Sequence, residues 1–148
     1  GYFLMVDLDQ FKEINDLYGH PEGDRILKET ATAMKLLFGK DSLIGRMGGD
    51  EFALLVYVPV SRMEIEDRMR QLIDHVEHIR SGGFRVSCSI GAQPVLRPGS
   101  AEALYREADG LLYQAKNRGK RQYVVGPEGE RACGAPESPR KERVKDPP

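Results

Sequence analysis

The chain has 148 residues, which is enough for one domain with a sizeable buried core. Its formal net charge of −1 excludes a bulk electrostatic attraction to nucleic acid or to an anionic membrane surface. No apolar run approaches the roughly 20 residues that span a bilayer, and no signal peptide is evident. The two cysteines, Cys88 and Cys133, suit neither a disulfide framework nor a zinc site. This favours a cytoplasmic location, either of a whole protein or of the cytoplasmic part of a membrane-anchored one.

The chain opens with a short apolar run, residues 2–6, which predicts a buried strand. Asp7 and Asp9 follow it directly, so acids stand where the strand meets a turn. If a neighbouring strand end also carries acids, the two ends can jointly hold a hard divalent cation such as Mg²⁺. That cation prefers oxygen ligands and often keeps phosphates as further ligands.

Two helices are expected next. Residues 11–17 predict a short helix and residues 18–23 a loop. Residues 24–38 carry apolar side chains at helical spacing, which predicts a helix that faces the core. Asp24 would then be an acid at a helix N-terminus, where the macrodipole favours a negative charge.

Two adjacent glycines, Gly48 and Gly49, separate apolar runs and predict a β-hairpin, because glycine supplies the positive φ of a tight turn. The first strand of this hairpin is expected over residues 42–47, and the second begins with the acids that follow the glycines. Glycine beside an acid also lets a bulky anion approach the backbone.

Asp50 and Glu51 stand directly after these glycines. Successive strand residues point to opposite faces of a sheet, so the two acids are expected to do different jobs. An isolated pair of this kind favours a hairpin whose acids only keep its tip in solvent. Together with the acids after the first strand, it predicts a shared cation site, with the first strand and the hairpin as neighbours in the sheet.

The rest of the chain predicts further elements. These are a helix capped by Ser61, a turn at 81–83, a strand over 84–92, a helix that begins at Ser100 and ends at Gly119, and an edge strand over 122–125. Residues 1–125 therefore form one domain. Residues 126–148 are rich in Pro, Gly and charge, and they predict a disordered tail.

Residues 48–52 read Gly-Gly-Asp-Glu-Phe, and residues 7–20 resemble the first signature of the family that carries this motif. From about residue 3 to residue 125 the chain resembles the GGDEF domains, the diguanylate cyclases. The resemblance implies an α+β fold of the palm-like, ferredoxin-related nucleotidyl-cyclase type, in which helices flank a central, mostly antiparallel sheet. The helix that usually precedes the first strand in this family is missing from the sequence.

The resemblance also implies an activity: the condensation of two GTP molecules into cyclic di-GMP, with release of pyrophosphate. Each chain has one site, so turnover would need a homodimer. The domain would be the output part of a longer signalling protein with an upstream sensor domain. The alternative is a catalytically weak or inactive GTP-binding domain that regulates a partner.

By the same resemblance, Asp7, the carbonyl of Leu8 and Asp50 would hold Mg²⁺ or Mn²⁺ on the triphosphate. Asp50 is the favoured general base, and Glu51 is the alternative base or a second metal ligand. Lys12 would stabilise charge in the transition state.

Substrate contacts are expected from the two helices after the first strand, from the hairpin and from the end of the last helix. A carboxylate can accept hydrogen bonds from the ring N–H and the exocyclic amine of guanine, which suits Asp24, and an amide such as Asn15 can also bind the base. The expected substrate-binding residues are Asn15, His20, Asp24, Gly48, Gly49, Lys116 and Lys120.

Two departures from the family pattern carry expectations. Lys120 stands where Arg is usual and Arg121 where Asn is usual, which predicts weaker GTP binding. The Arg-x-x-Asp motif at which product inhibits many members is absent, since its positions are Gly39 and Ser42. We therefore expect no product inhibition through that site.

Overall fold

The computed structural model describes residues 1–128, which form one central sheet, a small two-stranded sheet and four helices. In chain order the elements are β1 (Tyr2–Leu8), α1 (Phe11–Tyr18), α2 (His20–Phe38), β2 (Ser42–Gly48), β3 (Glu51–Val56), α3 (Arg62–Glu77), β4 (Arg80–Ser81), β5 (Phe84–Arg85), β6 (Cys88–Pro94), α4 (Ala101–Asn117) and β7 (Tyr123–Val125).

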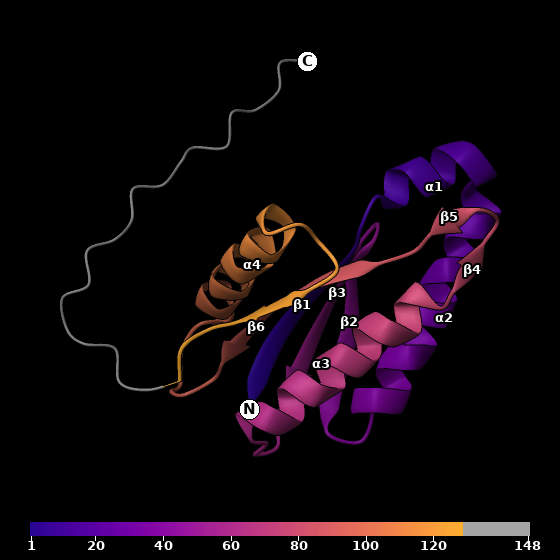
Figure 1. The fold of residues 1–148 in the computed structure, drawn as a ribbon. Helices are drawn as coiled ribbons and strands as arrows, with labels where there is room; N and C mark the ends of the chain where they lie inside the picture. Colours follow the sequence, from indigo (N-terminus) through magenta and orange to yellow (C-terminus); the bar gives the residue numbers. More distant parts are fainter. Residues whose placement is uncertain (129–148) are drawn as a thin grey trace.

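The central sheet has the strand order β2-β3-β1-β6-β7 (Figure 1). β1 is antiparallel to both β3 and β6, β2 is antiparallel to β3, and β7 lies parallel to β6. β1 takes the central place because its side chains are apolar on both faces from Tyr2 to Val6. The predicted α+β class and the pairing of the first strand with the hairpin are confirmed.

Helices cover both faces of the sheet (Figure 1). α2 and α3 cover one face, where the larger core cluster gathers. Its fully buried members include Leu4, Val6, Ile26, Met34, Leu54, Ile65, Met69 and Leu72. α4 covers the opposite face, where Met5 of β1 packs against Ala108 and Leu112.

α4 approaches β6 closely at Gly91. A Cβ atom at this position would lie 2.3 Å from the Ala108 carbonyl oxygen and 2.3 Å from the Leu112 backbone nitrogen. Only glycine allows the helix backbone to come this near the strand. This contact fixes α4, and the lysine in its last turn, relative to the sheet.

The loop predicted over residues 18–23 is wrong, because α2 begins at His20 and only Gly19 separates it from α1. Gly19 has φ 88°, which lets the chain turn sharply between the helices. Pro21 occupies the first turn of α2, where a missing N–H and a fixed φ favour a helix start.

The single strand predicted over residues 84–92 is also wrong. β5 pairs with β4 in a small hairpin around Gly82, whereas β6 begins only at Cys88. Cys88 lies opposite Leu8, the last residue of β1. Residues before Cys88 therefore have no strand of the central sheet beside them.

β7, the last strand of the sheet, ends at Val125, and the next residue still bonds to β6. Gly126 is buried, and its N–H donates to the Ala92 carbonyl at 2.8 Å. The predicted tail from residue 129 onward lies outside the described residues. Within residues 1–128, none of the helices combines the length and the apolar character that crossing a membrane requires.

Candidate functional site

The two acidic stretches meet at one end of the sheet, the end that carries α1 (Figure 1). Asp7 lies directly opposite Glu51 in the β1–β3 ladder, and the Leu8 N–H donates to the Asp50 carbonyl at 3.2 Å. Residues that oppose one another in an antiparallel pair project from the same face. Asp7 and Glu51 therefore both face the side that α4 covers.

The hairpin tip is formed by Gly49 and Asp50, between the end of β2 and the start of β3. Gly49 has φ 48°, and its carbonyl accepts a hydrogen bond from Nε of Arg46 at 3.0 Å. No atom lies within 4 Å of the position that a Cβ would take at Gly48 or Gly49. The backbone of the tip is therefore open to a ligand.

Asp7 is the most perturbed acid of this cluster. Burial raises its pKa to about 7; the ammonium of Lys116 opposes this rise and the nearby Asp50 reinforces it. One carboxylate oxygen, Oδ2, forms an ion pair with Nζ of Lys116. The other, Oδ1, is buried and has no hydrogen-bond partner among the described residues.

Glu51 experiences a similar environment. Burial raises its pKa, and the charges of Asp109 and Asp50 raise it further. A hydrogen bond with Tyr105 lowers it in part. Like charges held this close destabilise one another unless a cation joins them.

The residues at this edge fit a divalent cation. The unpartnered Oδ1 of Asp7 and the adjoining Asp50 are hard oxygen ligands that a cation would satisfy. Within residues 1–128, no three His, Cys, Asp or Glu side chains are grouped to enclose a metal. Such a sparse set suits Mg²⁺, which is commonly held by one or two carboxylates together with water and substrate phosphates.

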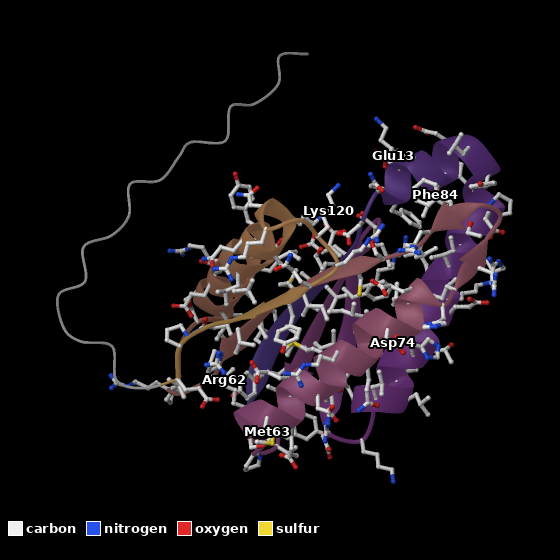
Figure 2. All side chains as sticks on the ribbon, in the orientation of Figure 1. Glu13, Arg62, Met63, Asp74, Phe84 and Lys120 are labelled. Carbon is white, nitrogen blue, oxygen red and sulfur yellow. The ribbon has the colours of Figure 1, made fainter. Side chains whose placement is uncertain are left out.

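Lys116 and Lys120 come from the end of α4. Lys116 lies in the last turn and contacts Asp7, as described above. The helix ends in a Schellman motif, in which the Gly119 N–H donates to the Lys116 carbonyl at 3.3 Å and the Lys120 N–H to the Ala115 carbonyl at 3.1 Å. Lys120 is exposed at the same end of the molecule as Glu13 of α1 (Figure 2).

A groove of about 480 Å³ lies between the sheet and α4, beside this cluster. It is lined by Asp7, Glu51, Tyr105, Asp109, Leu112, Tyr113 and Lys116. The sequence did not point to Tyr105 or Asp109 as site residues. Their spacing from Lys116 places them on one face of a helix, which is the signal that could have identified them.

The other predicted site residues lie on α1 and α2. Lys12 is exposed in the first turn of α1, and His20 is exposed at the start of α2. Asn15 is half-buried against Gly23, where a Cβ atom would lie only 1.9 Å from the Asn15 Oδ1 atom. The two helices thus hold the Asn15 amide at their contact.

Asp24 lies in the second turn of α2, since that helix begins at His20. The acid of the first turn is Glu22, so the expectation of Asp24 as a helix N-terminal acid is wrong. Asp24 is exposed and lines a groove of about 470 Å³ between α2 and the β2–β3 hairpin. The structure therefore gathers Asp7, Asp50, Glu51 and Lys116, whereas Asp24 belongs to a separate groove.

Asp9, which the sequence grouped with Asp7, has different surroundings. Its side chain is only 2% exposed, and its carboxylate accepts hydrogen bonds from the hydroxyls of Ser87 at 2.8 Å and Ser89 at 2.7 Å. The sequence did not point to either serine as a partner, because both come from a segment far along the chain.

The sequence matches the family model described as "Diguanylate cyclase, GGDEF domain" over residues 1–122. It is 36% identical over 125 residues to the diguanylate cyclase DgcS of Shewanella oneidensis, covering 84% of this chain and 42% of that protein. It is also 36% identical over 124 residues to the diguanylate cyclase DgcM of Escherichia coli K12, covering 82% and 30%.

The fold is similar to a solved structure of the diguanylate cyclase SiaD in complex with its activator SiaC from Pseudomonas aeruginosa. The TM-score is 0.76 at 31% sequence identity, and the match covers 84% of this chain and 49% of that one. The chain thus spans less than half the length of each of these relatives. With the GGDEF motif at the hairpin and the family match over nearly the whole described chain, this protein belongs to the GGDEF domain family of diguanylate cyclases.

Proposed function

We propose that this chain condenses two molecules of GTP into cyclic di-GMP and releases pyrophosphate. The observation that carries the proposal is the meeting of Asp7 with the acids of the GGDEF hairpin, beside Lys116, at one end of the sheet. Family membership supports the same reaction. In the longer protein, an upstream sensor domain would control this output domain.

The metal and phosphate contacts follow from the position of these groups. Asp7, the Leu8 carbonyl and Asp50 would hold Mg²⁺ or Mn²⁺. The ion would neutralise phosphate charge and polarise the reacting phosphate. Lys116 already contacts Asp7, so it lies within reach of phosphates bound there. Lys12 and Lys120 add positive charge at the same end of the molecule.

Asn15 and Asp24 would bind the guanine, with His20 nearby. A nucleotide whose base reaches these residues and whose phosphates reach Asp7 and Asp50 must extend across the hairpin tip. The open backbone at that tip would allow the close approach. A carboxylate at position 24 favours guanine over adenine, because adenine lacks the adjacent pair of donors.

In the reaction, the 3′-hydroxyl of one GTP attacks the α-phosphorus of another. The bond from this phosphorus to pyrophosphate breaks, and Asp50 accepts the hydroxyl proton. Glu51 is the alternative base, and burial, which raises its pKa, makes its carboxylate a stronger proton acceptor. The attack occurs twice, so two chains face one another with one GTP each.

Incubation of the chain with GTP and Mg²⁺, followed by anion-exchange chromatography, tests this function. We expect cyclic di-GMP to form at a rate that rises more steeply than linearly with protein concentration, because two chains must meet. Asp50→Ala should lower the rate by at least about 10²-fold while the circular dichroism spectrum stays unchanged. Asp74→Ala is the matched control, since Asp74 is an exposed acid of α3.

Wild-type turnover by Asp50→Ala would refute the role of that residue. If the unmodified chain binds GTP but forms no cyclic di-GMP at any protein concentration, the cyclase proposal fails. That outcome would instead support the alternative of a GTP-binding regulatory domain.

A further inference from the structure

Asp9 is a buried acid that the proposed reaction does not use. It follows β1 directly and is almost completely enclosed. Within the described residues, no Lys or Arg side chain forms an ion pair with it. Its carboxylate oxygens accept hydrogen bonds instead, two of which come from the Ser87 and Ser89 hydroxyls of a segment near the start of β6. Its own N–H donates to the Ser87 carbonyl at 2.8 Å.

A third hydrogen bond joins Asp9 to the segment that follows α4. The backbone N–H of Arg121 donates to Oδ2 of Asp9 at 3.3 Å. Arg121 follows Lys120 in the short segment that joins α4 to β7. Asp9 thus connects the end of β1, which carries Asp7 and Leu8, to the segment that carries Lys120.

The segment needs such a partner because its backbone is strained. Lys120 has φ 64° and Arg121 has φ 53°, and consecutive side-chain-bearing residues rarely adopt this left-handed region. The preceding Schellman motif anchors the Lys120 N–H to α4, and the Gln122 carbonyl accepts from the Ile90 N–H at 3.0 Å. Asp9 supplies the acceptor for the residue between these two anchors.

We propose that Asp9 is a positioning residue: it holds residues 120–121 in their left-handed conformation and so fixes the Lys120 ammonium relative to the metal-binding end of β1. This inference depends on the proposed function, because it assigns Lys120 to the triphosphate. Lys120 projects from the segment at this end of the molecule (Figure 2). Asp9 does not contact the nucleotide itself.

Two substitutions separate positioning from general stability. Asp9→Ser retains a polar atom near the serine hydroxyls, but its side chain is one bond too short to reach the Arg121 N–H. Asp9→Asn retains one oxygen that can accept from both Ser87 and Arg121, while its amide group donates to Ser89. Asparagine is therefore expected to rescue the position that serine loses.

The ligands are GMP and a GTP analogue with a methylene bridge between its α- and β-phosphorus atoms, measured by calorimetry with Mg²⁺. Asp9→Ser should weaken binding of the triphosphate analogue about tenfold, as expected for one misplaced charged contact. Binding of GMP should change by less than about threefold, because the base contacts lie on α1 and α2. Asp9→Asn should stay within about threefold of the unmodified chain for both ligands.

Equal weakening of both ligands by Asp9→Ser would show a structural role only and would overturn the proposal, as would unchanged binding of both. Amide hydrogen exchange in the unmodified chain gives a second measurement that needs neither nucleotide nor a folded variant. The Arg121 N–H is expected to exchange at least about tenfold more slowly than in an unstructured peptide, although its side chain is exposed. An unprotected Arg121 N–H would overturn the proposal.

Ligand binding and Arg121 amide exchange together separate the proposed function from the positioning role of Asp9. If the unmodified chain binds neither ligand, the proposed function fails, and Arg121 exchange still decides whether Asp9 holds the segment. If the chain binds the triphosphate but Asp9→Ser affects it no more than GMP, only the positioning role fails.

Discussion

Replacement of Gly23 by alanine tests whether the contact between α1 and α2 places Asn15 for nucleotide binding. Gly23 is buried within α2. A Cβ atom there would lie 1.9 Å from Oδ1 and 3.0 Å from Cγ of Asn15, and 3.1 Å from Cζ of Phe11. The first distance is impossible, so the Asn15 amide must move. Because that amide is the end of a half-buried side chain, it can rotate without unfolding the helices.

The expected changes in stability partly offset one another. Alanine is about 1 kcal/mol more favourable than glycine in a helix interior. Insertion of a methyl group into a packed contact costs about 1–3 kcal/mol. The free energy of unfolding should therefore fall by no more than about 2 kcal/mol. Loss of the amide's hydrogen bonding to guanine should cost about 1.4 kcal/mol, or about tenfold in affinity.

The assay is calorimetric titration of the uncleavable GTP analogue into Gly23→Ala, Asn15→Ala and the double variant. We expect the two single variants to bind equally weakly and the double variant to bind no more weakly than either. Gly110→Ala in α4 is the matched control, because no atom lies within 4 Å of its Cβ position. It should keep full affinity. Wild-type affinity of Gly23→Ala, or losses that simply add in the double variant, would refute the reasoning.

Two further predictions concern the packing of the sheet. Gly91→Ala should lower the free energy of unfolding by about 3 kcal/mol in urea denaturation. The added Cβ would meet the α4 backbone at Ala108 and Leu112, and backbone atoms cannot rotate away. A loss below about 1 kcal/mol would contradict the close contact. Cys88 should react with a disulfide reagent only as fast as the chain unfolds, because its side chain is fully buried and burial raises the pKa of its thiol. The measurement uses the variant Cys133→Ser, so that Cys88 is the reacting thiol. Rapid labelling of Cys88 in the native state would contradict the prediction.

Several local features could be predicted from the sequence because they depend on residues a few positions apart. Ser61 caps α3 as predicted, and it forms a capping box with Glu64. The buried side chains of that helix lie at helical spacing, at Ile65, Met69, Leu72 and Val76. Gly119 follows α4 at a positive φ, as the predicted C-terminal glycine should.

Predictions that needed a distant partner were less accurate. Gly23 was assigned to a loop, but it lies inside α2, where α1 packs too closely against it for a side chain. The start of β6 was placed too early, because it depends on where β1 ends and Leu8 meets Cys88. The residues that flank Cys88 do not encode this boundary, because the end of β1 sets it.

Asp7 and Asp9 show what the sequence alone determined about this protein and what only the tertiary structure decided. The motifs and the alternation of apolar and polar residues were sufficient to identify the family, the order of the principal strands and the presence of acids at the ends of two of them. They could not distinguish two aspartates separated by one residue. Tertiary contacts surround Asp9 with Ser87, Ser89 and the Arg121 N–H, and leave Asp7 beside Lys116 with one oxygen unpartnered. The physical reason is that burial and hydrogen-bond donors set the role of a carboxylate, and here both come from elements remote in the chain.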